Sequence, residues 1–88
     1  MKVSDLLALV EMKSVPKGRN LDYIGWLSGY LVVVFKGRMT KYVYGPNVAE
    51  VERDKIIRTP YPDSLFNKLK AKHDWQCLKV ERDPSKSV

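Results

Sequence analysis

The chain has little of what metal sites and disulfide-rich scaffolds require. Its 88 residues contain one cysteine, Cys77, and one histidine, His73. A single cysteine excludes an internal disulfide framework and fits a reducing compartment. A metal site built from Cys and His needs three or four ligands. We therefore expect no metal, no other cofactor and a cytoplasmic location.

Long apolar runs and catalytic motifs are also missing. The longest apolar run, Tyr30 to Phe35, is far shorter than the ~20 residues of a membrane span. Met1 to Val10 lacks the small-residue cleavage site of a secretory signal. The glycines form no phosphate-binding loop, and a nucleophilic pair of Cys77 and His73 has no orienting third group. The sequence thus predicts one non-enzymatic domain over residues 1–88, with its core at about 12–80, a polar tail at 81–88 and no membrane contact.

What the chain does have is positive charge. Sixteen Lys and Arg residues against ten Asp and Glu residues give a net charge of +6. Such an excess attracts polyanions, and nucleic acid is the commonest of these in a cytoplasm. Solubility alone is the alternative explanation of the charge.

Residues 21–44 predict a three-stranded antiparallel meander. Strand-favouring runs at Leu21–Leu27, Tyr30–Lys36 and Met39–Tyr44 are separated by Ser28-Gly29 and Gly37-Arg38, which suit tight turns. This register places on one face Ile24, Trp26, Leu31, Val33, Phe35, Tyr42 and Tyr44. The opposite face, called here the second face, carries Tyr23, Leu27, Tyr30, Val32, Val34, Met39 and Val43, with Lys41 as its clearly polar residue. We expect a cover over the second face: an N-terminal helix, a second subunit or a partner.

Helices complete an expected α+β fold. Ser4 can cap an N-terminal helix to about Lys13, followed by a loop over 14–20. Asn47 can cap a second helix to about Ile57, and Asp63 a third to about His73. Both later helices are expected on the face of the sheet that carries Ile24, Leu31 and Val33. The residues expected to face inward are Val48, Val51, Lys55 (by its stem), Ile56 or Ile57, Leu65, Phe66 and Leu69. Trp75–Val80 predicts a short fourth strand.

Two sets of side chains are candidates for binding. The cations that could contact phosphates are Lys17, Arg19, Lys36, Arg38, Lys41, Lys68 and Lys72. The candidates for docking a partner on the second face are Tyr23, Tyr30, Val32 and Val34. Tyr42 and Tyr44 either stack on bases or pack in the core. For the cations, the alternative to phosphate binding is that they only face solvent.

The order of several short motifs resembles the KTSC domain, a module found at the C-terminus of some lysyl-tRNA synthetases and as small stand-alone proteins. The matching segments are Ile24-Gly25-Trp26, Leu31-x-Val33-x-Phe35, Gly37, Tyr42-Val43-Tyr44, Val48 and Ser64 to Lys70. The likeness covers roughly residues 12–73. The chain departs from the family pattern by Trp26 in place of Tyr, by the longer stretch Tyr61-Pro62-Asp63, and at both ends. The resemblance implies RNA binding, the role suggested for that family.

Two functions follow as hypotheses. The first is a basic module that binds RNA or single-stranded nucleic acid through its loops and exposed aromatic residues. The second is a protein-interaction or regulatory factor, of the kind that phages and mobile elements encode, which docks a partner or a second copy through the second face. Salt separates them, because only phosphate binding weakens steeply as salt rises.

Overall fold

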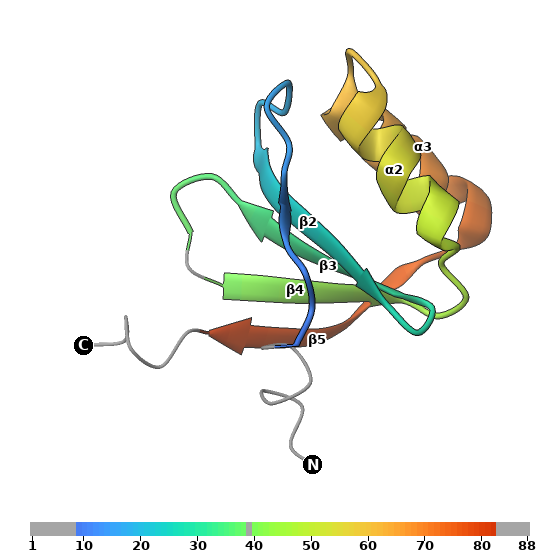
Figure 1. The fold of residues 1–88 in the computed structure, drawn as a ribbon. Coiled ribbons are helices and arrows are strands. Elements are labelled where there is room, and N and C mark those ends of the chain that lie inside the picture. The colour runs from blue at the N-terminus through green and yellow to red at the C-terminus, as the bar shows by residue number, and fades with distance from the viewer. Residues whose placement is uncertain (1–8, 39, 83–88) are drawn as a thin grey trace.

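The protein is an α+β domain in which two helices cover one face of an antiparallel sheet (Figure 1). The structure, a computed structural model, describes residues 9–38 and 40–82. Its five strands lie in the order of the chain: β1 (Lys13–Ser14), β2 (Leu21–Leu27), β3 (Tyr30–Phe35), β4 (Thr40–Gly45) and β5 (Gln76–Arg82). Helices α2 (Glu50–Arg58) and α3 (Pro62–His73) connect β4 to β5. The predicted class and meander are confirmed, and the sheet has one strand, β1, beyond the meander and the short fourth strand that were expected.

The predicted register of the central strands is confirmed. Trp26 pairs with Leu31 and Ile24 with Val33 across β2 and β3, and Val33 pairs with Tyr42 across β3 and β4. Both residues of the Ser28-Gly29 turn have positive φ, as the tightest hairpin turns require. The second turn starts earlier than predicted, because the Arg38 N–H donates to the Phe35 carbonyl at 3.1 Å, and Lys36 therefore lies in the turn and not in β3. Met39, the predicted start of the third strand, lies outside the described residues.

The face of the sheet under the helices holds the main core, which is called here the aromatic face. Its buried sheet residues, Leu21, Ile24, Leu31 and Val33, pack with Val48, Ile56, Phe66 and Leu69 from the helical half. Tyr42 and Tyr44 are half-buried, and their rings meet Phe35 and Phe66 edge-on, with centroids 5.3 and 5.2 Å apart. Burial, and then the nearby Cys77 and Tyr42 groups, raise the pKa of Tyr44. Of the two interpretations of this pair, core packing is the one that the contacts support.

The start of α2 differs from the prediction. Asn47 has a φ of 66°, so it cannot be an N-cap, and Ala49 occupies that position without a side-chain hydrogen bond. Val48 is buried, as expected, but it precedes the helix. Helical spacing counted from Val48 therefore predicts the wrong buried residues in α2. Val51 and Lys55 are consequently exposed, and Arg53 takes the buried position.

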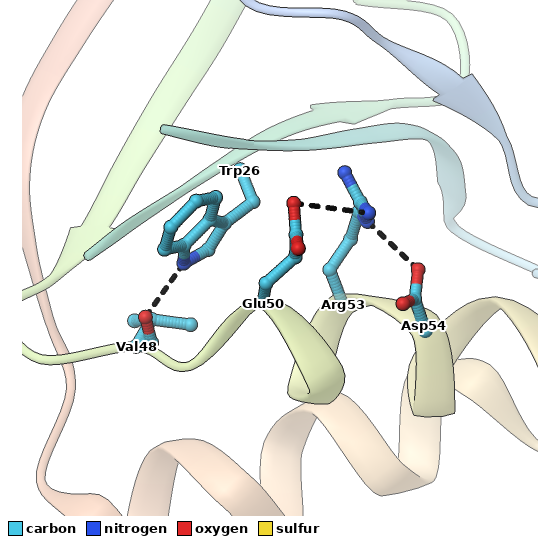
Figure 2. A network of polar contacts seen from close by, with 5 residues as sticks. All are labelled: Trp26, Val48, Glu50, Arg53 and Asp54. Atoms are coloured by element: carbon cyan, nitrogen blue, oxygen red, sulfur yellow. Dashed lines mark hydrogen bonds and ion pairs between the residues drawn. The ribbon is translucent and has the colours of Figure 1, made fainter. Parts of the chain in front are cut away.

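Arg53 lies between α2 and the sheet with its charge partly paired (Figure 2). Its Nε lies 3.0 Å from a carboxylate oxygen of Asp54, and an Nη lies 3.7 Å from one of Glu50. Beside it, the Trp26 indole Nε1–H donates to the Val48 carbonyl at 2.6 Å (Figure 2). This hydrogen bond attaches the loop before α2 to the sheet.

An extended segment, and not a helix, covers the middle of the second face. Residues 9–12 are irregular and Lys13 already belongs to β1, so the predicted helix is wrong over this part, and residues 1–8 lie outside the described residues. Val10 packs on Val32 and Val43, with Met12 and Leu27 at the margin. We call Val10–Met12 the N-terminal strap.

Gly25 makes room for the strap. A Cβ at this position would lie 2.4 Å from Val10 Cγ1, 2.8 Å from Met12 Sδ and 2.9 Å from the Glu11 carbonyl oxygen. All three distances are shorter than van der Waals contact permits. The absence of a side chain at Gly25 is therefore what lets the strap lie directly on β2.

The C-terminal strand is longer than expected. β5 pairs along β4 from Gly45–Gln76 to Thr40–Arg82, so the predicted fourth strand is confirmed and extends into the segment expected to be a polar tail. Trp75 lies just before the strand, buried, with its ring stacked on that of His73 at 5.3 Å. The rest of the predicted tail, residues 83–88, lies outside the described residues.

Candidate nucleic-acid interface

Asp63 joins the loop before β2 to the start of α3. Its Oδ2 accepts the Arg19 backbone N–H at 2.7 Å, and its Oδ1 accepts those of Asn20 and Leu21 at 3.1 and 3.0 Å. Asp63 was predicted as an N-cap of this helix, but Tyr61 is the N-cap, Pro62 is the first helical residue, and the carboxylate binds residues more than forty positions away in sequence. The loop over residues 15–20 is thereby held against α3.

The protonation of Asp63 reflects these contacts. Partial burial acts to raise its pKa, but hydrogen bonds from the backbone N–H groups of Arg19, Leu21, Asn20 and Asp63 itself outweigh burial and lower the pKa. Asp63 therefore remains ionised at neutral pH. Backbone N–H groups already bind the oxygens of Asp63 and so partly compensate its negative charge. This carboxylate therefore opposes the binding of an anion by the nearby Lys17 and Arg19 less than a free carboxylate would.

Two adjoining hollows open beside this contact. The first has a volume of about 250 Å³ and is lined by Lys17, Arg19, Pro60, Tyr61, Pro62, Asp63 and Ser64. The second has a volume of about 360 Å³ and is lined by Thr59, Tyr61, Ser64, Leu65 and Lys68. Tyr61 and Ser64 border both. Three of the predicted phosphate-binding cations thus lie around one aromatic side chain.

Tyr61 is the functional candidate that the sequence analysis missed. Its side chain is 71% exposed although it stands between two prolines in a short connection. Its N–H meets the Thr59 Oγ1 at 3.2 Å and its carbonyl accepts the Leu65 N–H at 3.0 Å, so both backbone groups are engaged. One signal in the sequence could have identified Tyr61. It is an aromatic residue in a short connection between two helices, and those helices already supply the apolar residues of the core.

The turn after β3 adjoins the same end of the sheet. The Lys36 N–H donates to the Asn20 carbonyl at 2.7 Å, which places the turn over residues 36–38 beside the loop over residues 15–20. Both connections lie at one end of the sheet in Figure 1. We define the basic end as Lys17, Arg19, Lys36, Arg38 and Lys68, all of them exposed.

The other two predicted cations lie elsewhere. Lys72 is exposed near the far end of α3, one turn beyond Lys68. Lys41 is half-buried in β4, in register with Val34 on one side and Glu81 on the other, and so belongs to the second face. The structure therefore brings five of the seven predicted cations to one region.

The residues predicted to dock a partner do not form one surface. Tyr23 and Tyr30 are 44% and 40% exposed, Val34 is half-buried, and Val32 is buried at 1% exposure under its own chain. Gly25, Val32 and Val43 lie side by side across the second face, and the strap covers this row. Tyr23 and Tyr30 lie on opposite sides of the row, so the strap separates them.

The remaining side chains of chemical interest offer no assembled centre. Within residues 9–38 and 40–82, no three His, Cys, Asp or Glu side chains gather closely enough to hold a metal ion. In the same part of the chain, neither helix has the length and apolar character to cross a bilayer. Cys77 is exposed on β5, and His73 contacts Trp75.

Comparison of the chain with known protein families, curated proteins and solved structures finds no match. The resemblance to the KTSC domain accordingly stays a prediction, and the function has to be argued from the site.

Proposed function

We propose that this protein is a small non-enzymatic module that binds nucleic acid, RNA or a single strand, through its basic end. One observation carries the proposal. The Asp63 carboxylate accepts the backbone N–H groups of Arg19, Asn20 and Leu21 and so ties the loop over residues 15–20 to α3, and Lys17 and Arg19 of this loop line the same hollow as the exposed Tyr61.

The charge distribution supports this proposal. With a net charge of +6, the protein attracts a polyanion at long range, and the exposed cations at the basic end supply phosphate contacts at short range. Anchored loops also bind at lower entropic cost than free ones, because less chain has to be ordered on binding. Lys36 and Arg38 extend the charged region beyond the hollow.

The test is binding of labelled single-stranded RNA, single-stranded DNA and duplex as a function of salt. Log affinity should fall linearly with log salt, and the double variant Lys17→Gln/Arg19→Gln should make the slope shallower by about 1.4, since each single-strand phosphate contact contributes about 0.7. Lys13→Gln/Lys55→Gln is the matched control. It removes the same charge from two exposed residues that border neither hollow.

Two results would reject the proposal. One is the absence of any complex at low salt and high protein concentration. The other is an equal loss of slope in the control variant, which would show that only the overall charge matters.

Docking of a protein partner or a second copy through the second face is the proposal of lower rank. The exposure of Tyr23 and Tyr30 supports it, but the strap between them leaves two small areas in place of one. Binding of that kind would be nearly insensitive to salt.

A further inference from the structure

We propose that the basic end binds an unpaired nucleotide, whose base stacks on the Tyr61 ring and whose phosphate is bound by Lys17 and Arg19. The inference rests on the proposed function and narrows it to single-stranded nucleic acid. A base inside a duplex is already stacked and paired, so its face is not open to a side chain without being extruded.

Tyr61 presents an exposed aromatic ring beside the cations of the basic end. Among the described residues, neither of the two core clusters includes Tyr61, and 71% of its surface faces solvent. Exposed aromatic residues beside cations are typical of single-strand binders.

The backbone around Tyr61 is pre-organised for such a role. Pro60 and Pro62 restrict the chain on either side, and both backbone polar groups of Tyr61 are hydrogen-bonded. A tyrosine has few rotatable bonds, so little entropy is lost when its ring is covered by a base. The ring therefore stands on a hydrogen-bonded stretch of backbone and borders the same hollow as Lys17 and Arg19.

The sizes of the hollows suit one part of a strand. The first hollow, of about 250 Å³, is smaller than the roughly 300 to 1,000 Å³ of small-molecule sites, and the second, of about 360 Å³, lies at the low end of that range. They are open and meet at Tyr61, and the first has two cations at its rim. This geometry matches one base on the ring with its phosphate beside Lys17 and Arg19, and the strand continuing past Lys68.

The experiment compares Tyr61→Ala, Tyr61→Phe and wild type for binding to a short labelled oligouridylate and to an RNA duplex of equal length, at one salt concentration. Tyr61→Ala should weaken oligouridylate binding about tenfold to a hundredfold, the usual effect of losing one stacked base. Tyr61→Phe should bind like wild type, and duplex binding should not change. Because Tyr61 is exposed, thermal unfolding of Tyr61→Ala should match wild type, which separates lost binding from lost folding.

Tyr23→Ala is the matched aromatic control. This tyrosine is exposed on the second face, opposite the face that α2 and α3 cover, and its loss should leave oligouridylate binding unchanged. A direct signature of stacking is quenching, by oligouridylate, of the added indole emission in Tyr61→Trp.

The outcomes distinguish this inference from the function on which it rests. If Tyr61→Ala binds oligouridylate as wild type does while Lys17→Gln/Arg19→Gln binds more weakly, stacking is refuted and the proposed function stands. Equal losses in Tyr61→Ala and Tyr23→Ala, or an equal loss of duplex binding in Tyr61→Ala, would also refute it. If wild type binds neither probe, both proposals fail.

Discussion

Replacing Gly25 by alanine should detach the N-terminal strap from the second face. The added Cβ would lie 2.4 Å from Val10 Cγ1 and 2.9 Å from the Glu11 carbonyl oxygen. A side-chain methyl group can move aside, but the carbonyl belongs to the backbone, so the strap as a whole must shift. Val32 and Val43 would then lose their cover.

The cost can be worked from the burial of the strap. Val10 is 6% exposed, and burying a valine side chain fully stabilises a fold by roughly 1.5 to 3 kcal/mol. Met12 is half-buried and adds about 1 kcal/mol on the same scale. Alanine is better than glycine within a strand by about 0.5 to 1 kcal/mol, which offsets part of the loss. We expect Gly25→Ala to lower the free energy of unfolding by about 1.5 to 3.5 kcal/mol.

Urea denaturation measures this change, and amide hydrogen exchange locates it. The Val15 N–H, which donates to the Asp22 carbonyl at 2.9 Å just after β1, should exchange faster, while amides of α3 keep their relative protection. Gly37→Ala is the control, since a Cβ there meets nothing within 4 Å and only the positive φ of 76° is strained. It should destabilise the protein without selective exchange at β1.

The reasoning fails if Gly25→Ala is as stable as wild type, or if its loss of protection is spread evenly over the sheet. A Val10→Ala background offers a second check. There the collision with Cγ1 is gone, so Gly25→Ala should cost less than it does in wild type.

Three further predictions concern stability. Asp63→Asn should lower the free energy of unfolding by about 1 kcal/mol at neutral pH, because it weakens the contacts to the loop over residues 15–20. Folding lowers the pKa of Asp63, so the stabilisation by its carboxylate is complete above an unfolded pKa of about 3.9 and is lost as the pH falls through the folded pKa. The urea midpoint of Asp63→Asn should therefore depend less on pH below about 4 than the midpoint of wild type does. Trp26→Phe should cost about 1 to 2 kcal/mol in thermal unfolding, because the Val48 carbonyl loses its indole donor, and an unchanged Tm would contradict this. The free energy of unfolding of Arg53→Met should stay within about 1 kcal/mol of the wild-type value, while that of Arg53→Ala should fall by about 1 to 2 kcal/mol, because the buried stem of Arg53 contributes more than its charge. Equal urea midpoints of the two variants would refute this.

The central sheet could be predicted because its signals are local. Alternation along β2, β3 and β4 and glycine-containing turns between them left one register that gathers Ile24, Leu31 and Val33, and the paired residues agree. The end of α2 before Pro60 and the buried stripe of α3 followed from similar short-range rules. The cations were recognisable as candidates from residue type alone.

The candidate site was predictable only in its parts. Lys17, Arg19 and Lys68 were named from the sequence, but their grouping depends on Asp63 binding the loop over residues 15–20 from the start of α3. Asp63 at the start of a helix is a normal capping pattern, so nothing local indicates a longer-range partner for its carboxylate. Tyr61 was overlooked for the same reason, since its exposure depends on what the two helices leave uncovered.

The sequence by itself determined which residues alternate, where the chain turns and how much charge it carries, because each property involves neighbours within a few positions. The tertiary structure decided that the strap lies on Gly25, that Arg53 takes a buried place on α2, and that the loop over residues 15–20 meets α3. Those contacts depend on the path of the chain between distant segments. They form because burial of apolar surface and pairing of backbone N–H groups must be satisfied for the whole domain at once.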